Sequence, residues 1–469
     1  MPTRVDVFLA SARAAQIGWA GMPLSQRLAI LGRTRRTMAH DPESLIGTLA
    51  DHRPIADTIA AELIPLADAI WFLETAAPRL LRRRRLRRGR PLWLAGVSAE
   101  VRREPLGVVL ILAPANFPLM LPGIQLVQAL AAGNAVSVKP AAGCAGPMLA
   151  LQDKLRLAGL PENVMHVLDE SVETGTQAVS AGYDKIVLTG SATTGAAVLA
   201  HAAPALTPAT MELSGSDPMF VLPSADIALV ADCIAYALRL NAGATCIATR
   251  RVFVPRLLAP VLEAELRTRA ANLPTERLPE RVRTALAEAE AAGARVCREG
   301  GAAIVVHPAG PVRTELRVLR DDLFAPIVSL IPVENIEDAL AADRACPYAL
   351  GATVFGDPAE ARSLIPRLRA GSVVVNDVIV PTADPRLPFG GRKRSGFGVT
   401  RGAEGLLEMT ALKSVSIRRG RFRPHLRPPA PGAASAMRAM LRLLHGSTRE
   451  RVGALSALVR LALKQHGGS

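Results

Sequence analysis

The stretch LGVVLILAPANFPLMLPGIQLVQALAAGNAVSV, residues 106–138, decides the fold. It contains no charged residue, and it is long enough to be mistaken for a membrane span. However, Pro114, Pro118 and Pro122 interrupt it, and a spanning helix would have to accommodate all three within nine residues. The stretch instead predicts a buried strand over 108–112, a loop, a packed helix near 122–132 and a second strand over 135–138.

Short apolar runs alternate with helical segments on both sides of this stretch. Residues 1–75 are expected to be helical, because apolar residues recur there at spacings of three and four. Downstream, strands are expected near residues 164–168 and 185–188, and a second series of strands and helices follows Glu212. This alternation is typical of parallel sheets covered by helices on both faces. The sequence therefore predicts an α/β protein with two doubly wound α/β domains.

Positive charge is concentrated in two segments outside this α/β region. The run Arg79–Arg90 contains eight arginines and no acid, and the segment from Arg418 onward carries eleven basic residues against the single acid Glu450. These two segments account for the net charge of +15. The arginine run has no aromatic residue that could stack on bases, so nucleic acid is not expected as a partner.

The five cysteines are scattered, with no CxxC pair and no spacing typical of zinc ligands. We therefore expect no metal site and no disulfide framework, and a reducing compartment. The first residues, MPTRVDVFLASARAA, lack an apolar core of signal-peptide length. These features are typical of a cytoplasmic protein.

Three short motifs combine residues that are suited to chemistry. TGSATTG (189–195) offers backbone amides at a helix start, which suits a phosphate, although a tight turn explains it equally well. MELSG (211–215) places Glu212 among apolar and small residues, where it could be a general base or part of a structural ion pair. NAGATC (241–246) surrounds Cys246 with small residues that admit a substrate to the sulfur, whereas an inert buried cysteine is the alternative.

Seven blocks in order resemble the aldehyde dehydrogenase superfamily. They are LAPANFPL (112–119), SVKPA (137–141), VLTGS (187–191), MELSG (211–215), NAGATC (241–246), DDLFAPIV (321–328) and LPFGGRKRSGFG (387–398). The match covers about residues 104–416, and the interval of 34 residues between Glu212 and Cys246 is usual in that superfamily. The resemblance implies an NAD(P)-dependent enzyme of the hydrolytic type, with a Rossmann-like cofactor domain and a catalytic thiol domain.

The resemblance also implies a role for each matching residue. Cys246 would attack the aldehyde carbonyl, and the Asn116 side chain with a backbone amide would hold the oxyanion. Glu212 would activate the water that hydrolyses the resulting thioester. The residues implied to bind NAD or NADP are Lys139 near the adenosine ribose, Gly190, Ser191 and Gly195 near the pyrophosphate, and Asp322 and Phe324 at the nicotinamide ribose and ring.

Three positions depart from the usual pattern of the superfamily. Ala115 stands where a tryptophan is common, which opens space beside the reacting carbon. Asp322 replaces a glutamate and is shorter by one methylene. Ala142 stands where NAD-preferring members often carry a glutamate. No carboxylate at this position therefore repels the 2′-phosphate of NADP, and either NAD or NADP is expected as the cofactor.

The same resemblance suggests how the chain is divided. Residues 1–80 and 104–212 would form the dinucleotide-binding domain, and residues 213–410 the catalytic domain. Residues 81–103 and 411–423 would form an oligomerisation hairpin and an edge strand, which predicts a homodimer or homotetramer. Residues 424–469 would form a proline-rich linker and a basic, amphipathic helical tail.

The tail leaves several functions open. Its helices could dock on their own protein, on a partner subunit or, as a peripheral contact, on an anionic membrane. A membrane contact would suit a hydrophobic aldehyde as the substrate. Two alternatives to an active enzyme are a catalytically weak member that only binds a dinucleotide and a membrane-docked interaction protein that acts through the tail. Glu212 argues for hydrolysis of the thioester over its transfer to coenzyme A.

Overall fold

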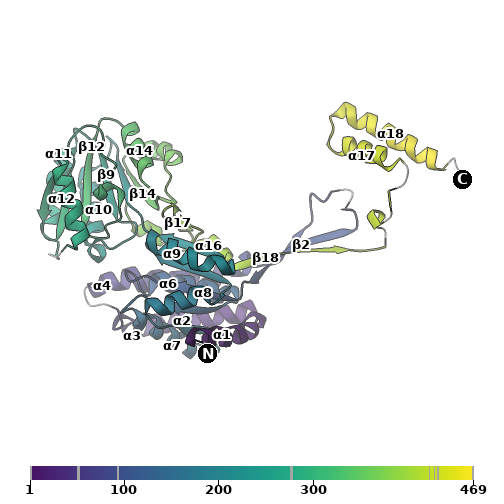
Figure 1. Cartoon of the computed structure of the whole chain (residues 1–469), viewed down its shortest axis with the longest axis horizontal. Coiled ribbons are helices and arrows are strands. Elements are labelled where there is room, and N and C mark those ends of the chain that lie inside the picture. Colours follow the sequence, from purple (N-terminus) through teal and green to yellow (C-terminus); the bar gives the residue numbers. More distant parts are fainter. Residues whose placement is uncertain are drawn as a thin grey trace. The chain divides into compact units, whose positions relative to one another are not determined.

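A six-stranded sheet lies among the helices formed by the first half of the chain (Figure 1). Its order is β17-β7-β6-β3-β4-β5, with β3 (Val108–Leu112), β4 (Ala135–Lys139), β5 (Met165–Val167), β6 (Lys185–Gly190), β7 (Ala209–Leu213) and β17 (Gly396–Phe397). Strands β3 to β7 are parallel, whereas β17 runs antiparallel to β7 and pairs Gly396 with Glu212. All five side chains of β3 are buried, as a central strand covered on both faces requires.

The computed structural model describes residues 3–49, 53–91, 94–274, 278–421, 423–426, 428–429 and 432–466. The chain divides into two units. The first unit comprises Met1–Arg84 and Val101–Ser414 and contains both α/β sheets. The second unit comprises Arg85–Glu100 and Val415–Ser469.

Helices cover the first sheet. The uncharged segment 106–138 forms part of this packed region and is not a membrane span. These elements are α1 (Arg4–Gly21), α2 (Leu24–His40), α3 (Glu43–Ile46), α4 (Ile55–Thr58), the π-helical turn η1 (Ile59–Leu63), α5 (Ile64–Leu80), α6 (Met120–Ala132), α7 (Ala145–Leu157), α8 (Val172–Ser180), α9 (Ala192–Ala202), η3 (Ala203–Ala205) and α16 (Gly402–Glu408). Every residue of α6 is buried, and the helix ends at Gly133, whose φ of 97° a residue with a Cβ would rarely adopt. The segment 106–138 is therefore a strand, a loop, a helix and a strand, as predicted. Among the described helices, none is both long and apolar enough to cross a bilayer.

A seven-stranded sheet forms the second α/β region, which confirms the predicted fold class. Its order is β10-β11-β12-β9-β8-β14-β15, with β8 (Asp217–Val221), β9 (Thr249–Pro255), β10 (Arg295–Glu299), β11 (Ala302–Val306), β12 (Ile327–Val333), β14 (Gly351–Phe355) and β15 (Ser372–Val375). All neighbours are parallel except β10, which is antiparallel to β11. One face packs on α10 and α11, and the other packs on α12, α14 and α15.

The remaining elements of this region are short or lie at its periphery. They are α10 (Ile227–Arg239), η4 (Leu240–Gly243), α11 (Ala259–Ala270), α12 (Glu280–Ala291), α13 (Arg317–Arg320), α14 (Ile336–Ala345), α15 (Pro358–Leu364), η5 (Ile365–Arg367), η6 (Val380–Ala383) and the two-stranded sheet of β13 (Tyr348–Ala349) and β16 (Arg392–Lys393). The second unit contains α17 (Ala433–His445), α18 (Thr448–His466) and the turn η7 (Pro424–Leu426). A three-stranded sheet of order β1-β2-β18 contains β1 (Arg84–Leu86), β2 (Val97–Pro105) and β18 (Thr410–Arg418).

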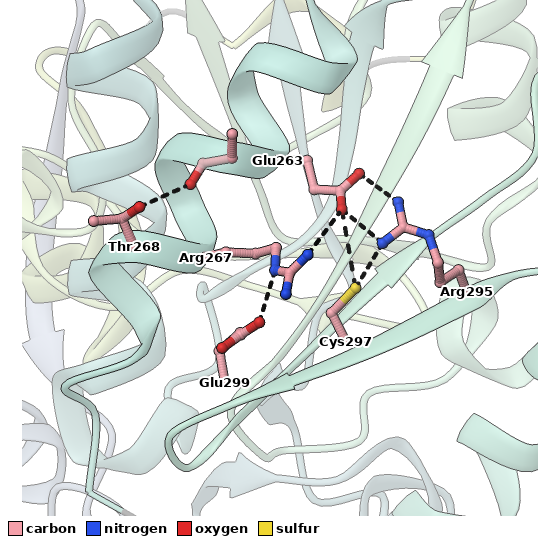
Figure 2. Close-up of polar contacts among 7 residues, drawn as sticks. Glu263, Arg267, Thr268, Arg295, Cys297 and Glu299 are labelled. Carbon is pink, nitrogen blue, oxygen red and sulfur yellow. Dashed lines mark hydrogen bonds and ion pairs between the residues drawn. The ribbon is translucent and has the colours of Figure 1, made fainter.

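Strand β10 was not expected from the sequence, because its residues continue the charged pattern of the preceding helices. Figure 2 shows how ion pairs join it to α11: Arg295 contacts Glu263, with nitrogen–oxygen distances of 2.6 and 2.7 Å. Arg267 Nε donates to Glu299 Oε1 at 2.7 Å, and Arg295 Nη1 lies 2.9 Å from Cys297 Sγ. Both arginine side chains are about half exposed, so these pairs contribute little to stability. Their charges instead keep an edge strand from pairing with other chains.

A buried ion pair predicts a much larger effect on stability. Arg251 on β9 donates to Asp343 Oδ1 at 2.8 Å and to the Ser216 carbonyl at 2.9 Å, and its side chain is 2% exposed. Asp343→Ala would leave this guanidinium without its ion-pair partner, so we expect a loss of about 3–5 kcal/mol in the free energy of unfolding. Guanidinium unfolding followed by circular dichroism measures the loss.

The exposed pair between Arg256 and Glu334 provides a matched control, because its 2.9 Å contact joins side chains that are 61% and 60% exposed. Glu334→Ala is expected to cost less than about 1 kcal/mol. Equal losses in the two variants would contradict the structural importance of the buried pair.

Candidate active site

In the first sheet, strands lie on both sides of β3. Strands β4 and β5, which follow β3 in the chain, lie on one side, and β6 and β7 lie on the other. In open α/β sheets, ligands bind where the strand order reverses, in the crevice outside the carboxyl ends of the strands. Asn116 follows β3, and Gly190 and Ser191 lie at the end of β6. These residues therefore lie at the expected ligand-binding edge.

A cavity of about 300 Å³ opens at this edge. Its lining comes from both α/β regions and comprises Pro114, Ala115, Asn116, Thr189, Gly190, Ser191, Glu212, Leu213, Ser214, Cys246, Arg281, Asp322 and Phe324. Seven of the nine site residues proposed from the sequence therefore meet in one cavity. Lys139 and Gly195 lie outside its lining.

Cys246 follows a tightly bent loop that precedes β9. Asn241 and Ala242 in this loop have φ values of 51° and 49°, which residues with a Cβ rarely adopt. At Gly243, an added Cβ would lie 2.7 Å from the carbonyl of Ala325, so only glycine fits there. The loop is thus held against a neighbouring segment of backbone.

Arg250 fixes the loop in this position. Its two terminal nitrogens donate to the carbonyls of Gly243, at 2.5 Å, and Ala325, at 2.6 Å, and its Nε lies 3.7 Å from Asp322 Oδ1. One buried side chain therefore joins the cysteine loop to the segment that carries Asp322 and Phe324. The sequence analysis did not identify Arg250; its only signal was a charge at the end of the small-residue stretch NAGATCIATR.

Asn116 is also linked to the cysteine loop. Its Nδ2 donates to the carbonyl of Ala244 at 3.3 Å. In return, Asn241 Nδ2 donates to the Asn116 carbonyl at 3.0 Å. An amide donor is thereby positioned in the same cavity as the sulfur, where a developing oxyanion could use it.

Glu212 is buried, with 3% of its surface exposed. Thr400 Oγ1 donates to its Oε2 at 2.8 Å, whereas its Oε1 has no hydrogen-bond partner among the described residues. Burial raises the pKa of Glu212, and the Arg401 charge and the side chains of Thr400 and Gln125 oppose this shift. A carboxylate with a raised pKa in the lining of the cavity is suited to accept a proton from a group there.

Cys246 lines this cavity and is partly exposed. Burial raises the pKa of Cys246, the carboxylates of Glu212 and Asp217 raise it further, and the Arg401 charge opposes them. The thiol is therefore protonated at neutral pH, and it needs a proton acceptor to become a nucleophile. Glu212 lines the same cavity.

A second cavity, of about 160 Å³, meets the first at Cys246. Its lining is largely apolar and includes Phe117, Met120, Leu121, Leu240, Ile247, Ile379, Val380 and Phe389, together with the polar residues Asp57, Tyr236, Thr245, Thr382 and Arg401. Cys246 thus lines both cavities. The sequence analysis did not identify Thr400 and Arg401, although only Val399 separates them from the GFG end of a matching block.

Asp322 provides an acceptor for a dinucleotide in the first cavity. Its Oδ1 accepts from the Phe324 amide at 3.0 Å, whereas its buried Oδ2 has no partner among the described residues. Burial raises the pKa of Asp322, and Arg250 opposes this shift. Ser191 caps α9 by accepting from the Thr194 amide at 3.1 Å, which places a helix start in the lining. Ribose hydroxyls and a pyrophosphate would find matching partners here, so the residues present fit the cofactor.

Lys139 and Gly195 make contacts outside the lining of the cavity. Lys139 ends β4, and its Nζ donates to the Glu170 carbonyl at 2.7 Å. At Gly195, an added Cβ would lie 2.8 Å from Leu213 Cδ1, so the missing side chain lets α9 pack on β7. Gly195 therefore positions the helix start rather than lining the cavity.

Comparisons with known proteins agree with this geometry. The model of the aldehyde dehydrogenase family matches residues 2–415. The chain is 30% identical over 448 residues to a betaine aldehyde dehydrogenase of Agrobacterium fabrum, covering 90% of this chain and 89% of that protein. It is 28% identical over 431 residues to a 4,4'-diapolycopene aldehyde oxidase of a Methylomonas species, covering 87% and 81%.

The fold is also similar to that of a solved structure. A mutant of aldehyde dehydrogenase C from Pseudomonas syringae, in complex with NAD+ and octanal, superposes with a TM-score of 0.79. It shares 28% sequence identity, and the match covers 88% of each chain. The family match spans most of the chain, and the sheets and the cavity belong to the matching region. The chain therefore belongs to the aldehyde dehydrogenase family, whose members oxidise aldehydes with NAD or NADP.

Proposed function

We propose that this protein oxidises a hydrophobic aldehyde to a carboxylic acid through a covalent intermediate on Cys246. The observation that carries the proposal is the shared cavity of Cys246, Glu212 and Asn116, which Asp322 also lines. A nucleophile, a base and an oxyanion donor in one enclosed space are the groups that acyl chemistry requires.

The first half of the reaction forms a thioester. The thiol proton of Cys246 leaves to solvent as Sγ bonds to the carbonyl carbon, and the Asn116 amide with a backbone amide at the cysteine stabilises the oxyanion. When bound, the nicotinamide ring supplies the hydride acceptor that makes the step an oxidation. Loss of the hydride from the tetrahedral carbon of the Cys246 adduct leaves the thioester.

The second half of the reaction is hydrolysis. Glu212 takes a proton from a water molecule, whose oxygen attacks the thioester carbon. The carbon–sulfur bond breaks, the carboxylic acid leaves, and the proton on Glu212 passes to the Cys246 sulfur, which restores the thiol and the base. In this proposal Asp322 binds the nicotinamide ribose with Phe324 beside the ring, Gly190, Ser191 and Gly195 shape the pyrophosphate site, and Lys139 lies near the adenosine ribose.

The second cavity supports a hydrophobic substrate, because most of the side chains that line it around the sulfur are apolar. Two similar proteins carry names or ligands of this kind, a diapolycopene aldehyde oxidase and a dehydrogenase bound to octanal. Each methylene that becomes buried contributes about 0.8 kcal/mol to binding. A longer aliphatic chain should therefore be preferred.

A panel of straight-chain aldehydes with NAD and NADP tests this function. We expect kcat/KM to rise from butanal to octanal by roughly tenfold or more, because up to four further methylenes are buried in the apolar cavity. The absorbance of the reduced cofactor provides the measurement. A flat or falling series would contradict the hydrophobic substrate, and cofactor binding without turnover of any aldehyde would favour the dinucleotide-binding alternative.

Subunit assembly and a membrane contact are further parts of the proposal. Strand β18 is at an edge of the sheet β1-β2-β18, and edge strands commonly pair with a second chain. We infer a homodimer or homotetramer assembled through this sheet, and sedimentation velocity would contradict it by showing a monomer.

The tail helices support a peripheral membrane contact. Helices α17 and α18 pack against one another, and among the side chains whose burial is described they bury Ala439 and Ala454. Apolar side chains stay exposed on both helices: Met437, Leu441, Val452, Leu455 and Val459. Arginines flank them, so the surface complements an anionic lipid headgroup layer.

Vesicle binding tests the membrane contact. We expect the full-length protein to bind vesicles of phosphatidylcholine and phosphatidylglycerol, and Leu441→Glu or Leu455→Glu to weaken binding about tenfold, because an inserted leucine is lost. Leu257→Glu is the control, because Leu257 is also an exposed leucine but lies in the first unit. Equal binding of all variants in a sedimentation assay would rule out the contact.

A further inference from the structure

Arg401 is a buried cation that lines the same cavity as Cys246. Only 8% of its surface is exposed, and its φ of 61° is rare for a residue with a side chain. Strained backbone of this kind persists where the surrounding structure enforces it, commonly at functional sites. The position of Arg401 is therefore held by more than its local sequence.

The guanidinium is fixed from three sides. Nη1 donates to the Thr382 carbonyl at 2.8 Å, Nη2 lies 3.9 Å from Met120 Sδ, and Cζ lies 4.9 Å from the ring centre of Phe389. None of these partners carries a charge. Among the described residues no carboxylate forms an ion pair with Arg401, so its charge is available to the cavity.

The residue before Arg401 contacts the base directly. Thr400 Oγ1 donates to Glu212 Oε2 at 2.8 Å, and its backbone is paired with Phe389 in both directions at 2.7 Å. In this short segment, Thr400 therefore holds the Glu212 carboxylate. The next residue, Arg401, places a positive charge in the lining of the cavity that Cys246 also lines. Phe389, which pairs with Thr400 and stacks on Arg401, fixes both.

The other ionisable neighbours of the reacting pair include carboxyl groups whose pKa values burial raises. Asp217 and Asp322 are the other carboxylates whose charges act on Cys246. Arg250 also acts on this group, but it lies against Asp322 and donates to two backbone carbonyls. Arg401 is therefore the cation whose charge acts on both Cys246 and Glu212, and it has no ion-pair partner among the described residues.

We propose that Arg401 is a positioning residue whose fixed charge stabilises the Cys246 thiolate and the Glu212 carboxylate, and so sets the pH range in which the nucleophile forms. The expected effect of Arg401 on turnover rests on the proposed function. The electrostatic effect itself exists without substrate or cofactor, because it depends only on groups of this chain.

Alkylation of Cys246 by iodoacetamide tests the proposal without aldehyde or NAD(P). Below the titration midpoint the alkylation rate follows the thiolate fraction, so a rise of about one pH unit in the midpoint slows it about tenfold. We expect this slowing in Arg401→Met and Arg401→Gln, and a rate within about twofold of the parent in Arg401→Lys, which keeps the charge. Mass spectrometry of the Cys246 peptide measures the rate.

Arg386→Met is the control, because it removes the same formal charge from an exposed arginine that pairs with Asp384. It should alkylate like the parent. Parent-like rates in Arg401→Met and Arg401→Gln would overturn the proposal. So would equal losses in the Lys, Met and Gln variants, which would indicate a purely structural role.

A third outcome would also overturn it. Unchanged alkylation with a raised KM for aldehydes that carry a carboxylate would show that Arg401 binds substrate instead. Because alkylation needs no turnover, an inactive parent enzyme would contradict the proposed function alone.

Discussion

Replacing Cys246 by alanine is expected to abolish the aldehyde-dependent formation of reduced cofactor. The sulfur is shared by the two cavities, and in the proposed reaction it forms the bond that every later step needs. Loss of a covalent nucleophile lowers kcat by a factor on the order of 10⁴ or more. Absorbance of the reduced nicotinamide, with the best aldehyde of the panel, measures this change.

Cofactor binding separates this effect from misfolding. Cys246→Ala removes no side chain proposed to bind the dinucleotide, so calorimetric titration with NAD or NADP should give a dissociation constant close to that of the parent. Cys233→Ala is the matched control, because Cys233 is buried in α10 with the core of the second sheet. Turnover that survives in Cys246→Ala, or is lost equally in Cys233→Ala, would refute the assignment of the nucleophile.

Replacing Glu212 by glutamine is expected to have the second largest effect. General base catalysis contributes about 10²–10⁴ to a rate, and the glutamine keeps the shape and the acceptor for Thr400 while it loses the basic oxygen. If the slow step becomes hydrolysis, the first turnover should still release up to one equivalent of reduced cofactor, followed by slow steady turnover. Stopped-flow absorbance measures the burst and the later rate separately. Glu404→Gln, at an exposed position of α16, should behave like the parent.

The pH dependence of steady turnover gives an independent check on Glu212. The base works when it is deprotonated, and burial raises its pKa above the ordinary carboxyl value. Turnover should therefore be lost as the pH falls through this raised pKa, at a higher pH than an exposed glutamate would give. The same limb should be absent from the steady rate of Glu212→Gln. An unchanged limb in that variant would assign the titration to another group.

The strands of the first sheet could be predicted because their local patterns and their tertiary environment agree. The apolar run 108–112 is a fully buried central strand, and the helix that follows is buried on all sides. The short strands β10, β16 and β17 could not be predicted. Two of them have two residues each, and their pairing partners, such as Met211 and Glu212 for β17, lie far away in the sequence.

The residues of the candidate site also divide into those that could be predicted from the sequence and those that could not. Cys246, Glu212 and Asn116 could be proposed because each lies in a distinctive block of sequence. Thr400 could not, because its contact with Glu212 joins positions 188 residues apart and a threonine carries no chemical signature of its own. Residues that hold a reactive group in place are recognisable only once the chain has folded around that group.

The pairing of Gly396 with Glu212 has a consequence for how the protein is made. During synthesis, the strand with the base and the loop with the sulfur leave the ribosome long before residues 396–401 do. Until that late segment arrives, Glu212 lacks both its antiparallel neighbour and the Thr400 hydroxyl. A nascent chain, or one cut short by a premature stop before residue 396, would thus carry both reactive groups without the segment that seats the base.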